Sequence, residues 1–162
     1  MVSANALHKS GAELRLKELG LVLTAPPTPF GNYVESLLTG NLLFLTGMLP
    51  VVDHKPAYLG RLGKELDANQ GRDAARIAAL SALAAIKAHL GSLDKVTKIV
   101  RLGIFIAATD DFFNQPPVAD GASDLFHQVF GPEGVAVRLV IGVVSLPLGV
   151  PIELEVIAEV AA

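Results

Sequence analysis

Two apolar segments near the C-terminus decide the fold: VAVRLVIGVV (residues 135–144) and IELEVIAEV (residues 152–160), separated by the turn sequence LPLG (residues 146–149). Side chains alternate between the two faces of an extended strand, and both segments are rich in the β-branched residues that strands favour. In the first segment, Arg138 is the single charged residue among apolar ones and glycine. In the second, glutamates alternate with apolar residues. The pattern therefore predicts two strands joined as a β-hairpin.

Arg138 is the residue of this hairpin that most needs an explanation. A guanidinium among valines and alanines is costly to remove from water unless an anion meets it. It can be half of a structural ion pair, with Glu155 or Glu159 as its partner, or a receptor for an anionic ligand. The glutamates of the last strand also suit a solvated face. The sequence alone leaves these roles open.

The predicted hairpin also places Arg138 relative to Glu153. If the turn centres near Leu148, Arg138 lies opposite the region of Glu159, whereas Glu153 lies close to the turn. Six residues at about 3.3 Å each then separate Arg138 from Glu153 by about 20 Å. We therefore expect that these two side chains do not meet within one chain. If they act together, they do so across a subunit interface.

The first half of the chain predicts a helix and a hairpin. An apolar stripe over residues 10–19, with Ser10 or a neighbour as the cap, predicts a short helix that ends at Gly20. The proline-rich connector of residues 25–29 then leads to two strands, residues 33–38 and 42–46, that flank a turn at residues 39–41.

The second half predicts two helices with a strand between them. Asp67 and Gln70 form a capping-box pattern before a long alanine-rich helix, residues 68–90, which Gly91 ends. Residues 96–108 predict a strand. A second amphipathic helix follows Pro116 and Pro117, is marked by apolar residues from 122 to 129, and ends before Gly131-Pro132.

Together these elements predict an α+β fold with both main helices on one face of the sheet. The opposite face then needs cover, and association with other copies of the chain is the simplest source of it. We divide the chain into an N-terminal helical extension, residues 1–24, and a single domain, residues 25–162.

Composition excludes several classes of protein. The chain of 162 residues is 51% hydrophobic with a net charge of −3, which favours an oligomer and offers no electrostatic footprint for nucleic acid. No apolar stretch is long enough to span a membrane and the N-terminus lacks a signal-peptide core, so a cytoplasmic location is expected. There is no cysteine, the four histidines are far apart in sequence, and no phosphate loop is present. We expect no metal and no organic cofactor.

Several short motifs, taken in order, resemble the YjgF/RidA family, also labelled the L-PSP endoribonuclease family. They are GNYV (residues 31–34), LTGMLP (residues 45–50), the alanine-rich helix, Arg138 on a late strand, and LP at 146–147 followed by IELE at 152–155. The resemblance implies a chorismate-mutase-like (YjgF-like) mixed sheet with two helices on one face, to which this chain adds an N-terminal helix. It also implies a homotrimer with clefts between subunits.

The resemblance further implies an activity: hydrolysis of reactive enamine and imine acids, such as 2-aminoacrylate, to 2-keto acids and ammonia. Arg138 would bind the substrate carboxylate, and Glu153 would orient or deprotonate the attacking water. Substrate-binding positions would be Tyr33 and Thr46 in the cleft wall, with backbone groups near Gly47 and Val140.

This chain departs from the family pattern at three positions. Leu139 and Val140 follow the arginine, where typical deaminases have serine and then cysteine, threonine or alanine. Asp120 is expected at the start of the last helix, where asparagine is usual, and its charge could repel an anionic substrate. An alternative function is therefore a non-catalytic protein that binds small carboxylates in the same cleft.

Overall fold

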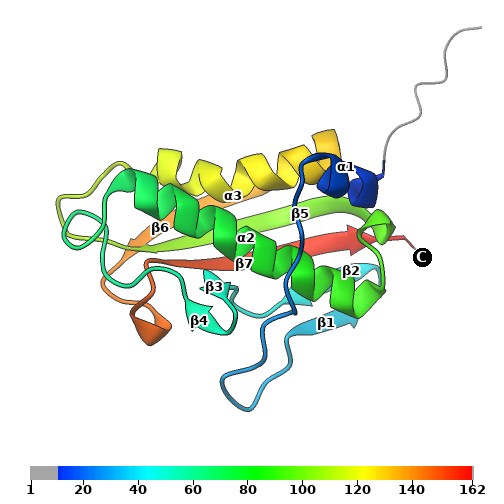
Figure 1. Ribbon diagram of the computed structural model, residues 1–162, viewed down its shortest axis with the longest axis horizontal. Helices are drawn as coiled ribbons and strands as arrows, with labels where there is room; N and C mark the ends of the chain where they lie inside the picture. The colour runs from blue at the N-terminus through cyan, green and yellow to red at the C-terminus, as the bar shows by residue number, and fades with distance from the viewer. Residues whose placement is uncertain (1–10, 162) are drawn as a thin grey trace, which may run out of the picture.

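The computed structural model describes residues 11–161, which form one layer of helices packed on one sheet (Figure 1). The α-helices are α1 (Ala12–Glu18), α2 (Ala68–Leu90) and α3 (Gln115–Phe130). The strands are β1 (Ser36–Thr39), β2 (Leu42–Leu45), β3 (Val51–Val52), β4 (Lys55–Pro56), β5 (Val96–Ala107), β6 (Val137–Val143) and β7 (Ile152–Val160). The α+β class and the order of the main elements agree with the sequence-based prediction, to which the short β3–β4 ribbon is an addition.

The main sheet has five strands in the order β1-β2-β7-β5-β6. β5 pairs with β7 antiparallel and with β6 parallel, so β5 lies between the two C-terminal strands. The predicted hairpin of the two C-terminal segments is therefore wrong. The physical reason is the helix α3 between β5 and β6, because a strand–helix–strand crossover returns the chain parallel to its first strand.

Helix α2 is fixed at both ends by local chemistry. The Asp67 side chain accepts a hydrogen bond from the Gln70 backbone N–H, and the Gln70 side chain accepts one from the Asp67 backbone N–H. At the other end, Gly91 adopts a left-handed backbone with φ of 80°, a conformation that glycine reaches at little cost. Both boundaries agree with the prediction.

Helix α3 begins at Gln115, slightly before the predicted start. Pro116 and Pro117 occupy its first turn, where a missing backbone N–H leaves no hydrogen bond unmade. Gly121 lies against the backbone carbonyl of Arg72, leaving no room for a Cβ atom, so α2 and α3 are in close contact there.

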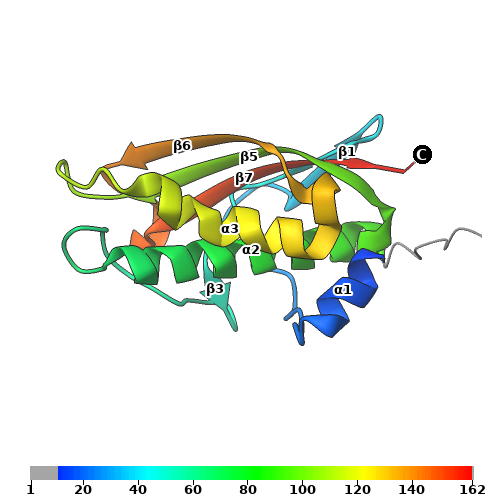
Figure 2. The same ribbon diagram turned by 90° about the horizontal axis from the view of Figure 1, so that it is seen from above.

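Both long helices cover the same face of the sheet (Figure 2). That face supplies the buried residues of β5 and β7, including Leu102, Ile104, Leu154 and Val156. On the opposite face no helix of residues 11–161 covers the sheet, and large apolar side chains are exposed there. They are Leu37, Phe44, Val137, Leu139 and Ile141.

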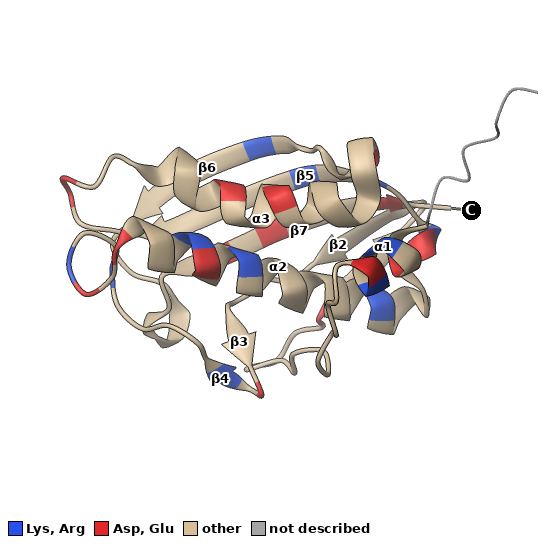
Figure 3. Cartoon of the chain, turned by 45° about the horizontal axis from the view of Figure 1, so that its top comes forward, with Lys and Arg blue, Asp and Glu red and all other residues tan. Residues whose placement is uncertain are grey.

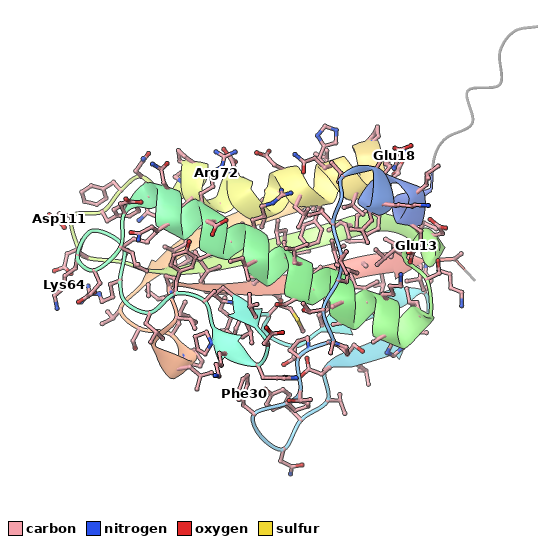
Figure 4. The ribbon with its side chains drawn as sticks, in the orientation of Figure 1. Glu13, Glu18, Phe30, Lys64, Arg72 and Asp111 are labelled. Carbon is pink, nitrogen blue, oxygen red and sulfur yellow. The ribbon has the colours of Figure 1, made fainter. Side chains whose placement is uncertain are left out.

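Helix α1 packs on the end of the helical layer. Ala12 and Leu16 are buried in the main core, and the Glu13 carboxylate accepts hydrogen bonds from the Lys87 ammonium at 2.7 Å and from the Leu93 backbone N–H at 2.9 Å. Figure 4 labels Glu13 together with Glu18 of the same helix. The predicted cap at Ser10 lies outside the described residues. Within those residues, no helix is both long and apolar enough to cross a membrane.

Candidate functional site

Arg138 lies on β6 and points toward the helical layer. It is in register with Leu102 of β5, which is buried under the helices. Its Nη1 atom donates to Asp120 Oδ1 at 2.6 Å and to Ser123 Oγ at 3.1 Å, and both acceptors belong to α3. The Arg138 side chain remains 28% exposed, because β6 is an edge strand. Figure 3 shows the basic position of β6 beside acidic positions of α3.

The ion pair considered from sequence therefore forms, but with another partner. Glu155 accepts a hydrogen bond from Arg101 Nε at 3.1 Å, and Glu159 accepts one from the Thr97 hydroxyl at 3.0 Å. Glu155 and Glu159 both belong to β7, which β5 separates from β6, so neither carboxylate reaches Arg138. The hairpin assumption had placed Glu159 opposite Arg138, and the true register places Leu102 there.

We expected Asp120 at the start of the last helix. It lies instead well inside α3, which begins at Gln115. Sequence reasoning did not identify Ser123. A signal was available, because residues three apart on a helix lie on the same face, and Asp120 and Ser123 have this spacing.

Glu153 lies on the open face of the sheet. It is in register with Phe105 of β5, one step out of phase with the buried Ile152 and Leu154. Its carboxyl lies against Gly47, where a Cβ atom would overlap it. Partial burial raises the pKa of Glu153 above its usual value. No described residue donates a hydrogen bond to this carboxyl, so it is a candidate base.

Thr46 and Gly47 lie beside Glu153, where β2 ends. The Thr46 backbone N–H donates to the Glu35 carbonyl at 2.9 Å, and Gly47 precedes Met48, which bridges to Leu154 of β7. Sequence reasoning also missed Glu35, whose carboxyl pKa is raised by partial burial. The Glu153 carboxyl thus lies against Gly47, and Thr46 directly precedes Gly47 in the chain.

Tyr33 and Val140 belong to other surroundings. Tyr33 lies before β1, which starts later than predicted, and its hydroxyl accepts a hydrogen bond from the Phe30 backbone N–H at 2.8 Å. Val140 is on the same face of β6 as Arg138 and packs partly against the main core. Of the predicted substrate-binding residues, Val140 and Asp120 therefore accompany Arg138, and Thr46 and Gly47 accompany Glu153.

Within one chain, Arg138 and Glu153 are on opposite faces of the sheet. Their strands are separated by β5, and their register partners there, Leu102 and Phe105, are three positions apart. Strand spacing of about 4.8 Å and a rise of about 3.3 Å per residue place their Cα atoms about 14 Å apart. The separation is smaller than the hairpin estimate, but the two side chains still do not meet.

Two hollows differ in their relation to these residues. One of about 290 Å³ lies between α3 and β6, and its lining includes Ser123, His127 and Arg138. A larger one, about 920 Å³, lies between α1, the connector after it and α2, and it contains none of the predicted site residues. The smaller hollow is the one that belongs to the candidate site, because Arg138 is in its lining. Across residues 11–161, no three acidic or histidine side chains converge in a way that could hold a metal ion.

Comparison with known proteins gives a consistent result. A family model described as "YjgF/chorismate mutase-like, putative endoribonuclease" matches residues 13–160. The chain is 39% identical over 145 residues to protein TCP17 of Trypanosoma cruzi, which covers 89% of this chain and 91% of that protein.

Two crystal structures are similar over nearly the whole fold. One is the Agrobacterium tumefaciens protein Atu1372, described as of unknown function, with 36% identity, a TM-score of 0.86, and coverage of 93% of this chain and 92% of that one. The other is a "putative endoribonuclease" of Shewanella oneidensis, with 30% identity, a TM-score of 0.90, and coverage of 93% of this chain and 100% of that one.

Proposed function

The chain belongs to the YjgF/chorismate mutase-like family, and on that premise we propose that it hydrolyses reactive enamine and imine acids to 2-keto acids and ammonia. The substrates are small, of the 2-aminoacrylate type. The observation that carries the proposal is the Glu153 carboxyl, which is partly buried, has a raised pKa and receives no hydrogen bond from a described residue. A carboxylate of raised pKa is a better proton acceptor near neutral pH.

The chemistry requires a carboxylate receptor and a base. Arg138 binds the substrate carboxylate, and Glu153 takes a proton from a water molecule as its oxygen attacks the imine carbon. Glu153 passes this proton to the substrate nitrogen, which gives a tetrahedral intermediate with a hydroxyl and an amino group on the same carbon. The hydroxyl proton then moves to the amino group through Glu153, the C–N bond breaks, and ammonia leaves as the carbonyl forms. Imine and water are thus converted to keto acid and ammonia, and Glu153 is regenerated. The imine carbon is already electrophilic, so the proposal includes no organic cofactor.

We place each catalytic site between two subunits of a homotrimer. Arg138 is on the edge strand β6, and Glu153 is on the face of the sheet that no helix covers. An exposed apolar surface on that face supports burial against other copies of the chain. In such an assembly, Arg138 of one subunit and Glu153 of its neighbour can line one cleft. Tyr33, Thr46, Gly47 and Val140 then belong to the cleft wall.

A coupled reaction tests this proposal. A pyridoxal-phosphate-dependent serine dehydratase releases 2-aminoacrylate, and the decay of the imine is followed with and without the protein. We expect the wild-type protein to accelerate the decay, and Arg138→Ala and Glu153→Gln to lose most of that acceleration. An imine lifetime unaffected by the wild-type protein would exclude the activity. Full activity in the Arg138→Ala variant would exclude the site.

A second function, binding of small carboxylates without catalysis, is favoured by one observation. Arg138 already has an anionic partner in Asp120, at 2.6 Å, and a receptor of reduced net charge suits reversible binding. This function predicts an Arg138-dependent rise in melting temperature with 2-keto acids and no acceleration of imine decay. The endoribonuclease label has less support, because the net charge of −3 gives no overall electrostatic attraction for RNA.

A further inference from the structure

The two bonds from Arg138 to α3 use only one of the three guanidinium nitrogens. Nη1 donates to Asp120 Oδ1 at 2.6 Å and to Ser123 Oγ at 3.1 Å. A guanidinium carries five N–H groups, of which Nη1 holds two. No described residue accepts a hydrogen bond from Nε or Nη2, so the whole Nε–Nη2 edge keeps its three donors.

That edge has the geometry of a carboxylate receptor. Nε–H and one Nη2–H are parallel and match the two oxygens of a carboxylate in a bidentate pair. A flexible arginine must lose side-chain freedom to make such a pair. A neighbouring residue that already holds the arginine side chain in place lowers this entropic cost. Arg138 is partly exposed, and the hollow of about 290 Å³ between α3 and β6 includes it in its lining.

The two acceptors are rigidly placed. Asp120 directly follows the buried Ala119 of α3, Ser123 directly follows the buried Ala122, and Gly121 is in contact with the backbone of α2. A helix held on both sides cannot easily rotate or shift, so its carboxylate fixes the direction of the guanidinium.

We propose that Asp120, assisted by Ser123, is a positioning residue that orients the Nε–Nη2 edge of Arg138 toward the substrate carboxylate. This inference rests on the proposed function, in which Arg138 is the receptor. It reverses the expectation from charge alone, because Asp120 would then strengthen anion binding rather than oppose it. Positioning of Arg138 raises the affinity for a carboxylate and charge repulsion lowers it, so replacing Asp120 distinguishes the two roles.

Pyruvate, the product of 2-aminoacrylate hydrolysis, is the probe, and its affinity is measured by calorimetry on the full chain. If Asp120 positions Arg138, Asp120→Ala weakens pyruvate binding at least tenfold. Asp120→Asn keeps an acceptor oxygen and retains affinity within about threefold. Ser123→Ala weakens binding less than Asp120→Ala. If Asp120 only repels anions, both Asp120 variants bind pyruvate more tightly than wild type, and that result would overturn the inference.

Two controls make the test specific. Asp73→Asn removes an acidic side chain of α2 that accepts a hydrogen bond from the Tyr58 hydroxyl, away from Arg138, and leaves pyruvate affinity unchanged. In an Arg138→Ala background, Asp120→Ala has no further effect, because there is no guanidinium to orient. A further loss in that background would contradict the positioning role. If Asp120→Ala does not fold, Ser123→Ala decides: weaker pyruvate binding supports the positioning role, and unchanged binding contradicts it.

The outcome for this inference is separable from that for the proposed function. Pyruvate binding that depends on Arg138 and Asp120, without imine hydrolysis, would support the inference and exclude the deaminase activity. Imine hydrolysis that depends on Arg138, with tighter binding in Asp120→Ala, would support the activity and exclude the inference. Absence of pyruvate binding by the wild-type protein would count against both.

Discussion

Arg138 of β6 and Glu153 of β7 lie on opposite faces of one sheet, with β5 between their strands. Arg138 points toward α3 and bonds to Asp120, whereas Glu153 is on the face that no helix covers. One chain therefore holds two incomplete halves of the proposed site. A role for both residues in one reaction requires a second copy of the chain, so the proposed activity depends on the proposed assembly.

The raised pKa of Glu153 predicts how its replacement affects stability. The pKa of Glu153 in the folded protein lies above the usual value, so folding favours the protonated form. The free energy of unfolding therefore falls as the pH rises from the usual glutamate pKa to the raised one. Glu153→Gln should therefore raise the melting temperature by about 2 °C at pH 7, with no gain below about pH 4. Differential scanning fluorimetry from about pH 3 to about pH 8 measures the difference in melting temperature between Glu153→Gln and wild type.

Glu155→Gln is the matched control for that experiment. It changes the next glutamate on the same face, but Glu155 is paired with Arg101 at 3.1 Å, so its replacement should not stabilise the protein at pH 7. Equal gains from both variants would mean that general charge repulsion on this face, rather than burial of Glu153, is responsible.

The open face of the sheet predicts the effect of a charge on assembly. Ile141 is exposed there in a single chain, and in the proposed trimer it is buried between subunits. Ile141→Lys should convert a trimer of 17.0 kDa chains into monomers, because a buried lysine without a partner is costly. Light scattering coupled to size-exclusion chromatography reports the mass. Val22→Lys, on the exposed connector, should leave the mass unchanged.

Glu13 predicts how strongly α1 is attached. Burial alone would raise its pKa, but hydrogen bonds from the Leu93 N–H and the Lys87 ammonium hold the pKa below the usual value. Glu13 therefore stabilises the fold when the pH is above the usual glutamate pKa, and this contribution is lost as the pH falls through the lowered pKa. Glu13→Gln should cost about 1 kcal/mol at pH 7, as measured by urea unfolding, and less at pH 3.

Glu18→Gln provides the comparison for α1. Glu18 is exposed on the same helix and has no ion pair among the described residues, so the free energy of unfolding should stay within about 0.5 kcal/mol of wild type. A similar loss in both variants would show that helix propensity or net charge, and not the contacts of Glu13, causes the effect.

Much of the fold could be predicted because local signals specify it. The capping box at Asp67 and the left-handed Gly91 define α2 without reference to the rest of the chain. The alternation of glutamate with apolar residues correctly assigns the two faces of β7, because side-chain period is a local property of a strand.

The partner of Arg138 was harder to predict, because it depends on how distant segments pair. Adjacency in sequence suggested a hairpin of β6 and β7, whereas α3 makes β6 the parallel neighbour of β5. The strand–helix–strand order contained this information. The contact between Gly47 and Glu153 could not be predicted locally, since it depends on the bridge between Met48 and Leu154.

A mixed-subunit experiment tests the shared site most directly. Arg138→Ala and Glu153→Gln chains are co-expressed in equal amounts with different tags, and oligomers that contain both are purified and assayed for imine hydrolysis. Each variant alone should be inactive. In each trimer that contains both variants, one of the three clefts combines an intact Arg138 with an intact Glu153 from the neighbouring subunit, so about one third of the wild-type rate should return. Mixed oligomers as inactive as the separate variants would contradict a site shared between subunits.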